Sequence, residues 1–437
     1  MTTVAKVLLA LQPGDVGYSP DNPYRWTDAE GILTDPEVVA GLNATYASPK
    51  NAAARVMKID TRNLLIPGAP FPRKTAITPP TITVHSAPNT LNPNQSFSAA
   101  SLLTNGMATF CRAGNFITVG SGKSPTYRTP RAGAGREPFS LMHGFDGIRV
   151  AYILTSAPGA AWRLMVDDEY VSDINSTAGV GGGATSIIDV SFTDARPRRI
   201  RLDLTGSDLQ SVIVGPTDTM WALQPRGPRC IVIGDSYTGG SGAAPTGYNS
   251  LSSWVWSFAD IVGWDDVWQS GIGGTGWINR NASQTNNYED RVAADVVGFA
   301  PEVVMLYGAR NDYSNGAVAI GQAAGRTVAA IRAGLPNALI FVLGPDGSAH
   351  PVDGSADTTW KPIQDQIFSA VAATSGVITL DTCLPGIYTG TGKAGATTGS
   401  GNGDVYMQSD AVHPTQAGSD YLGRRVAQKV MAALAAV

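Results

Sequence analysis

Four short runs of apolar residues stand in the second half of the chain, and they constrain its fold more than any other feature. Each run is four or five residues long and almost free of polar side chains, as expected for strands buried on both faces of a parallel sheet. Helical periodicity is visible at 318–333 and at about 415–435. This alternation predicts a parallel sheet with helices on both faces. The runs are Cys230–Ile233, Val303–Leu306, Leu339–Leu343 and Val377–Leu380.

The residues from about 75 to 225 predict an all-β domain, a sandwich or jelly roll. Short segments rich in Val, Ile and Thr alternate there with turn residues. Before them, residues 1–72 are irregular and rich in proline, and we expect an attachment arm with one short helix at Asp35–Leu42. The predicted domains are therefore 1–72, 73–226 and 227–437. The expected strands are 81–84, 148–154, 162–166, 187–192, 200–204 and 212–214.

Charge and cysteine content exclude several classes of protein. The 437 residues include 31 Lys and Arg against 35 Asp and Glu, a net charge of −4, so no global field attracts nucleic acid or an anionic membrane. Three cysteines, Cys111, Cys230 and Cys383, are too few for a disulfide framework and suit no zinc site; we expect buried thiols. The first twelve residues lack a signal-peptide pattern and no run is long enough to span a membrane, which predicts a soluble protein.

Two polar loops carry residue types that fit nucleophilic catalysis. Gly234-Asp235-Ser236 follows the first buried strand directly, where open α/β sheets place their sites. Asp410 and His413 stand three residues apart, just before the last helix. At this spacing the carboxylate can fix the imidazole tautomer, which leaves the other ring nitrogen to take a proton from a serine.

Two further loops could stabilise an oxyanion. Asn311 follows the strand Val303–Leu306, so its amide could donate to a developing negative charge. The segment Gly271–Gly276 is glycine-rich and satisfies G-x-G-x-x-G, but no complete βαβ unit surrounds it, and we reject dinucleotide binding. Its backbone N–H groups could instead approach an oxyanion without side chains in the way.

Taken in chain order, these four segments resemble the blocks of the SGNH (GDSL-type) hydrolase family over about residues 227–437. The resemblance implies a three-layer α/β/α domain of flavodoxin-like type and ester hydrolysis with neither metal nor cofactor. The G-x-S-x-G elbow of α/β hydrolases is absent around Ser236. One departure is Ala309, which occupies the glycine position of the third block, usually G-x-N-D.

The resemblance also implies roles for single residues. Ser236 would attack the acyl carbon, His413 would act as general base and then as acid, and Asp410 would support the imidazole. The oxyanion hole would combine the N–H of Ser236, the N–H of Gly274 and the Asn311 side chain, with Gly273 as a rival to Gly274. Side chains next to these blocks could contact the substrate, namely Asp235, Tyr237, Trp277 and Tyr313.

A β-domain before an SGNH domain resembles the layout of carbohydrate deacetylases, which implies an O-acetyl esterase acting on a carbohydrate. Two alternatives stay open: a lipase or thioesterase for longer acyl chains, and a non-catalytic glycan-binding or virion protein. An acidic chain without a signal-peptide pattern and with a proline-rich arm resembles a phage virion-associated esterase. We therefore expect an extracellular or virion-associated protein, with a cytoplasmic location as the open alternative, and a homo-oligomer is compatible with the sequence. The arginines at 196, 198, 199 and 201 suggest an exposed strand edge or a surface for an acidic polysaccharide.

Overall fold

The computed structural model divides the chain into two compact units, which separate between Pro225 and Arg226. The arm predicted at 1–72 lies outside the described residues except for β1 (Val7–Ala10) and β2 (Tyr24–Thr27), an antiparallel pair. The helix expected at 35–42 is also outside them. No helix in the described part of the chain has the length and apolar character to cross a membrane. The structure describes residues 7–10, 24–27, 80–85, 95–98, 102, 107–112, 116–119, 122–125, 138–171, 185–240, 250–281, 286–345 and 349–435.

The second unit contains a sheet whose five described strands are all parallel. Their order is β15-β14-β16-β17-β18, which corresponds to 2-1-3-4-5 along the chain, the flavodoxin-like order. The order reverses between β14 and β16, and open α/β sheets bind ligands beyond the carboxyl ends of strands at such a point. The strands are β14 (Cys230–Gly234), β15 (Val267–Gly271), β16 (Val303–Leu306), β17 (Leu339–Leu343) and β18 (Val377–Leu380).

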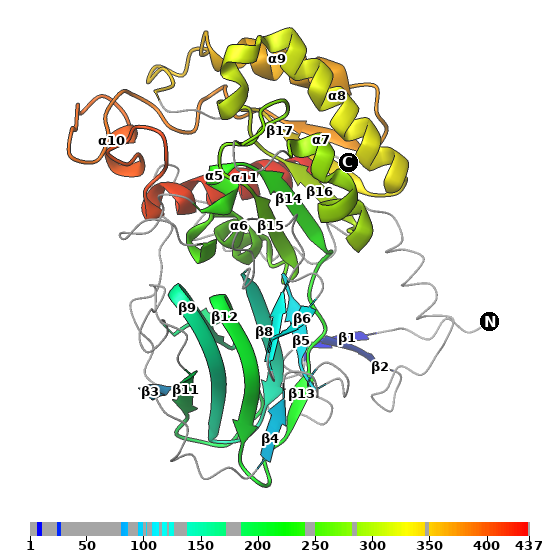
Figure 1. The fold of residues 1–437 in the computed structure, drawn as a ribbon, viewed down its shortest axis with the longest axis vertical. Coiled ribbons are helices and arrows are strands. Elements are labelled where there is room, and N and C mark those ends of the chain that lie inside the picture. Colours follow the sequence, from blue (N-terminus) through cyan, green and yellow to red (C-terminus); the bar gives the residue numbers. More distant parts are fainter. Residues whose placement is uncertain are drawn as a thin grey trace. The chain divides into compact units, whose positions relative to one another are not determined.

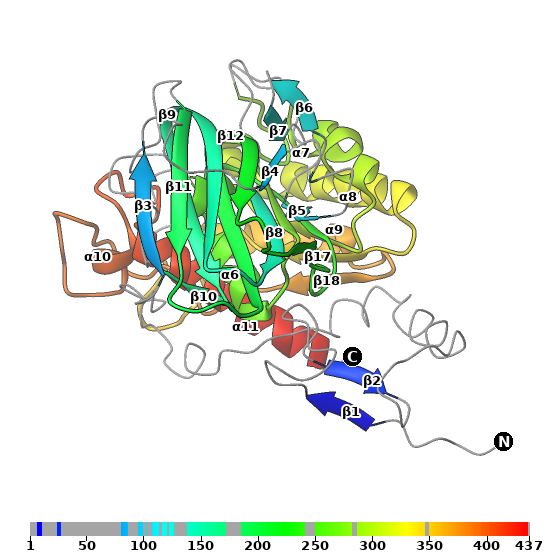
Figure 2. The ribbon, with the colours of Figure 1, turned by 90° about the horizontal axis from the view of Figure 1, so that it is seen from below.

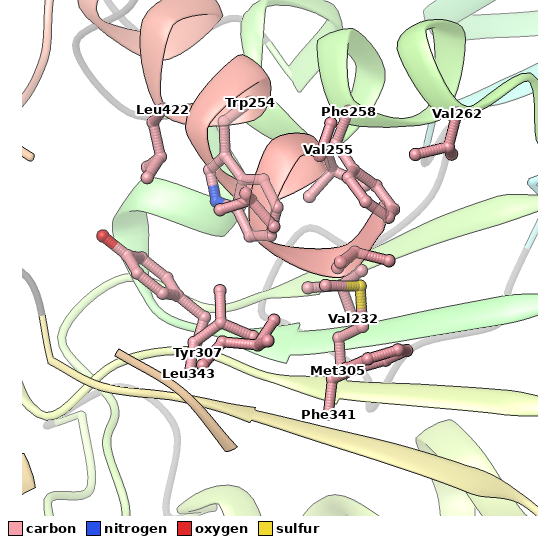
Figure 3. Packing of buried hydrophobic residues seen from close by; sticks show 14 of the residues in the cluster. Val232, Trp254, Val255, Phe258, Val262, Met305, Tyr307, Phe341, Leu343 and Leu422 are labelled. Carbon is pink, nitrogen blue, oxygen red and sulfur yellow. The ribbon is translucent and has the colours of Figure 1, made fainter. Parts of the chain in front are cut away.

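Helices cover both faces of this sheet, so the predicted three-layer α/β/α fold is confirmed (Figure 1). Alternate residues of each strand point to opposite faces, and each face forms its own apolar core with its helices. The face of Val232 and Met305 packs against α6 and α11, as Figure 3 shows. The face of Ile231 and Val304 packs against α7, α8 and α9. These helices are α6 (Trp254–Val262), α7 (Tyr288–Arg291), α8 (Ala317–Gly334), α9 (Trp360–Val371) and α11 (Gln416–Ala435).

The predicted strands of this unit match the observed ones within a residue at each end. Three of these five helices escaped the sequence analysis, namely α6, α7 and α9. Helix α6 is buried along almost its whole length, so it shows no polar stripe by which a helical period could be recognised. The three cysteines are buried thiols outside any disulfide in the described part of the chain, and burial raises the pKa of the Cys230 thiol.

The first unit contains an antiparallel sheet, while the jelly-roll topology stays a prediction. The main strand order is β13-β8-β12-β9-β11-β3, and Figure 2 shows the long neighbours β9 and β12 beside β11 and β3. The strands are β3 (Thr81–His85), β4 (Gln95–Ser98), β5 (Thr109–Cys111), β6 (Phe116–Val119), β7 (Gly122–Pro125), β8 (Phe139–Phe145), β9 (Arg149–Val166), β10 (Glu169–Tyr170), β11 (Thr185–Ser191), β12 (Arg198–Val214) and β13 (Met220–Ala222).

Two pairs of expected strands prove to be single long strands. The segments 148–154 and 162–166 belong to β9, and 200–204 and 212–214 belong to β12. The two strands pair from Ile200↔Val166 to Val214↔Val150, with register shifts between Thr205 and Ser207 and between Leu209 and Ser211. Such irregularities interrupt the period of two, which explains why the sequence suggested shorter strands.

The arginine cluster corrects another expectation, because most of it is buried in a central strand. Arg198, Arg199 and Arg201 are 1%, 3% and 5% exposed, so they form neither an exposed strand edge nor a polysaccharide surface. Asp203, fully buried, accepts hydrogen bonds from Arg163 and forms an ion pair with Arg201 at 3.0 Å. Buried arginines need such partners, which a sequence does not reveal.

Candidate active site

Ser236 stands at the carboxyl end of β14, the strand beside the point where the strand order reverses. Asp235 caps the short helix α5 (Ser236–Gly239), because its carboxylate accepts a hydrogen bond from the N–H of Tyr237 at 3.0 Å. The hydroxyl of Tyr237 in turn donates to the carbonyl of Val412. One residue of α5 is therefore bonded directly to the loop that carries His413.

The structure brings Ser236, His413 and Asp410 into one hydrogen-bonded chain. Nε2 of His413 lies 3.0 Å from Oγ of Ser236, and Nδ1 lies 2.7 Å from Oδ2 of Asp410. The other carboxylate oxygen of Asp410 accepts the N–H groups of Val412 and His413, at 2.8 and 3.0 Å. The imidazole is thus oriented by its own loop, with one nitrogen toward the serine, as general base catalysis requires.

The two carboxyl groups of these loops experience opposite environments. Partial desolvation acts to raise the pKa of Asp410, but the hydrogen bonds from His413 and from the loop N–H groups outweigh it and hold the pKa below its usual value. Burial raises the pKa of Asp235 to about 6, although the N–H of Tyr237 and the charge of His413 oppose the rise. Asp410 therefore suits the role of an ionised partner for a positive imidazole. For Asp235, burial makes the ionised form of the carboxyl group less favourable.

Besides Ser236, the residues expected to form an oxyanion hole lie on the loops that follow β15 and β16. Asn311 lies in the first turn of η4 (Arg310–Asn315), just beyond β16. Its side-chain NH₂ donates to the carbonyl of Thr275 at 2.9 Å. The glycine-rich loop follows β15, and the side chain of Asn281 donates to the carbonyl of Gly273 at 2.6 Å. The N–H groups of Gly273 and Gly274 both stay candidates for the oxyanion donor.

Only one of the four side chains expected to contact a substrate is well exposed. Tyr313 is 65% exposed, whereas Asp235, Tyr237 and Trp277 are at most 2% exposed. The ring of Trp277 packs against Tyr288, with centroids 5.2 Å apart, inside the apolar core. These three side chains are packed within the domain, and their contact with a substrate stays a prediction.

Two buried charged residues behind the site had no role in the sequence analysis. Arg291 is fully buried and donates to the carbonyls of Ser270 and Gly234, at 2.9 and 3.1 Å, where β15 and β14 end. Asp312, next to Asn311, accepts hydrogen bonds from the segment that follows the glycine-rich loop. The Asn-Asp pair was visible in the sequence, but the position of Arg291 had no recognisable signal. Among the described residues, no cluster of His, Cys, Asp and Glu could hold a metal ion.

The comparisons with known proteins agree with this arrangement. Residues 232–421 match the GDSL-like lipase/acylhydrolase family, and a search of curated proteins found no match. One similar solved structure is a family two carbohydrate esterase from Clostridium thermocellum in complex with cellohexaose, with 15% identity and a TM-score of 0.52 over 75% of this chain and 100% of that chain. A second is the salicylyl-acyltransferase SsfX3 from a tetracycline biosynthetic pathway, with 16% identity and a TM-score of 0.57 over 78% of this chain and 98% of that chain. A third is the acetyl xylan esterase Est2A from the rumen bacterium Butyrivibrio proteoclasticus, with 11% identity and a TM-score of 0.51 over 78% of this chain and 99% of that chain.

At these identities the solved structures establish a common fold and nothing more specific. Their coverage of three quarters of the chain extends beyond the second unit, so the likeness includes part of the β-domain. The matched segment 232–421 begins within β14 and ends within α11, and it contains every loop of the candidate site. Residues 232–421 are therefore similar to the GDSL-like lipase/acylhydrolase family, and the chain is a carboxylic ester hydrolase.

Proposed function

We propose that the chain is a serine esterase that removes O-acetyl groups from a carbohydrate through an acyl-enzyme on Ser236. The observation that carries this proposal is the hydrogen-bonded chain from Asp410 through His413 to Ser236. Nucleophile, base and orienting carboxylate are within hydrogen-bonding distance of each other, which is the geometric signature of an activated serine. A purely structural role does not require the loop of Asp410 and His413 to meet the loop of Ser236 in this order.

The reaction follows from this geometry in two halves. Oγ of Ser236 attacks the acyl carbon while Nε2 of His413 takes its proton, and Asp410 stabilises the imidazolium that forms. The oxyanion of the tetrahedral intermediate is held by the N–H of Ser236, a glycine N–H of the 271–276 loop and the Asn311 side chain. His413 then protonates the leaving alcohol. Water attacks the acyl-enzyme in the second half, with His413 again as base, and acetate is released.

The carbohydrate part of the proposal is supported by the fold relatives. One of them is described as a carbohydrate esterase in complex with cellohexaose, and another as an acetyl xylan esterase. The exposed ring of Tyr313, two residues after Asn311, offers a flat face of the kind on which a sugar can stack. A third relative is described as a salicylyl-acyltransferase.

The direct test measures acetate release from acetylated xylan and acetylated cello-oligosaccharides, together with a series of 4-nitrophenyl esters from acetate to octanoate. We expect turnover to fall as the acyl chain lengthens, and Ser236→Ala to lower kcat by at least about 10³-fold. Ser375→Ala, at an exposed serine before β18, is the matched control and should retain full activity. Rates that rise with chain length would support a lipase or thioesterase, and activity that survives Ser236→Ala would overturn the mechanism.

A further inference from the structure

The carboxylate of Asp312 binds three consecutive backbone N–H groups of the segment that follows the glycine-rich loop. The N–H of Trp277 donates to Oδ2 at 2.7 Å, and the N–H groups of Ile278 and Asn279 donate to Oδ1 at 3.1 and 2.7 Å. Asp312 is fully buried. Three charge-assisted hydrogen bonds in a site shielded from water hold a backbone segment far more firmly than neutral turns do.

The loop is shaped to admit this carboxylate. A Cβ atom on Gly276 would lie 2.1 Å from Oδ2 of Asp312, so only glycine lets the carboxylate approach. The side chain of Asn279 donates to the carbonyl of Gly274 at 2.8 Å. The segment held by Asp312 is therefore bonded in turn to one of the two glycines that are candidates for the oxyanion donor.

The second oxyanion candidate is on the same turn as Asp312. Asn311 precedes it directly in η4, and its side-chain amide donates to the carbonyl of Thr275. Two neighbouring residues thus contact the loop on either side of Gly276. Oxyanion donors work only when they are held within about 0.5 Å of the productive position, and this pair of contacts fixes the loop and the amide relative to each other.

We propose that Asp312 is a positioning residue, which holds the 271–279 loop against Asn311 so that the backbone and side-chain donors of the oxyanion hole converge on one point. This inference rests on the proposed esterase mechanism and adds to it the residue that maintains the geometry. Asp312 itself does not touch the reacting atoms. Its effect is exerted on the transition state, where the oxyanion forms, and not on the binding of the ester.

The test combines Asp312→Asn with Asn311→Ala in a double-mutant cycle on 4-nitrophenyl acetate. Asparagine preserves the size of the side chain but puts an NH₂ group opposite N–H donors. We expect Asp312→Asn to lower kcat by about 10- to 100-fold with KM changed by less than about 3-fold. In the Asn311→Ala background, the same change should lower kcat by less than about 3-fold, because the convergence that it protects is already lost.

Asp381→Asn is the matched control. Asp381 also accepts two backbone N–H groups, from Cys383 and Leu384, but it follows β18 at the far side of the sheet, so kcat should be unchanged. Rates are normalised to the folded active sites counted by a serine-directed organophosphonate. If Asp312→Asn does not fold, Gly276→Ala takes its place in the test. This variant displaces the Asp312 carboxylate without removing it and should cause the same fall in kcat.

The outcomes separate this inference from the function on which it rests. If the wild type hydrolyses the ester through Ser236 but Asp312→Asn retains its kcat, the positioning role is overturned and the esterase mechanism stands. Effects of Asp312→Asn and Asn311→Ala that multiply in the double variant would also overturn it. If the wild type turns over no ester, both proposals fail together.

Discussion

Ala309 adopts a backbone conformation that suits glycine, so Ala309→Gly should be tolerated in spite of the lost side chain. Its φ is 122° and its ψ is −2°, a region in which a residue with a Cβ atom is strained by about 1–3 kcal/mol. The variant relieves this strain. It also loses a fully buried methyl group, which costs about 0.8 kcal/mol, and gains entropy in the unfolded chain, which costs about 0.4–1 kcal/mol. The middle of these ranges leaves a small net stabilisation of about 0.5 kcal/mol.

Ala324→Gly is the matched control, because Ala324 is equally buried in the same apolar core but lies within the regular helix α8. There the lost methyl group adds to the poor helix propensity of glycine, and the variant should lose about 1.7 kcal/mol. The two Ala→Gly changes are thus expected to differ by about 2 kcal/mol in the free energy of unfolding.

Urea unfolding followed by tryptophan fluorescence measures this difference, since six of the nine tryptophans lie in residues 226–437. The midpoint of Ala309→Gly should equal or exceed that of the wild type, at an unchanged slope with denaturant. A loss of stability as large as that of Ala324→Gly would refute the reasoning, because it would show that the strain at position 309 contributes nothing.

Three more predictions concern carboxylates in different settings. The folded-state pKa of Asp235 is raised to about 6, so the folded wild type binds more protons than the unfolded chain and loses stability as pH rises from about 4 to 6. In urea unfolding, the stability of Asp235→Asn relative to the wild type should therefore increase by up to about 3 kcal/mol between pH 4 and pH 7. A stability difference that stays constant with pH would contradict this. Asp410→Asn should lower kcat by roughly 10²-fold or more, because the imidazole loses its orienting acceptor; an unchanged kcat in steady-state assays would rule out that role. Asp203→Asn should destabilise the β-domain by about 3–5 kcal/mol in thermal unfolding, since it leaves buried arginines uncompensated; a loss below about 1 kcal/mol would contradict that account.

Local patterns in the sequence were enough to predict the parallel sheet and the meeting of its loops. Strands such as Val303–Leu306 are buried on both faces, so their composition alone indicates them. Ser236 and Asn311 follow adjacent parallel strands, whose carboxyl ends necessarily lie at one edge of the sheet. These deductions need only short stretches of chain and one rule of topology.

Features that depend on distant partners could not be predicted in the same way. Arg199 and Arg201 suggested a surface because a lone arginine is rarely buried. Their burial depends on partners distant in the sequence or on the strand itself, Asp168 for Arg199 and Asp203 for Arg201. Trp277 stands beside a catalytic block in the sequence, yet its ring turns into the core toward Tyr288. Proximity along the chain therefore indicates which loop a residue belongs to, but not which way its side chain points.

The long separation of the proposed nucleophile and its base along the chain has a consequence for biogenesis. Ser236 follows β14 and His413 precedes α11, so two atoms that end up 3.0 Å apart belong to residues 177 positions apart in the sequence. A chain emerging from the ribosome carries its serine long before the imidazole that would activate it, and the serine stays unreactive until the last helix is in place. Ester turnover is thus a readout of complete assembly of this domain, and in a refolding experiment it should return later than the fluorescence of the buried tryptophans.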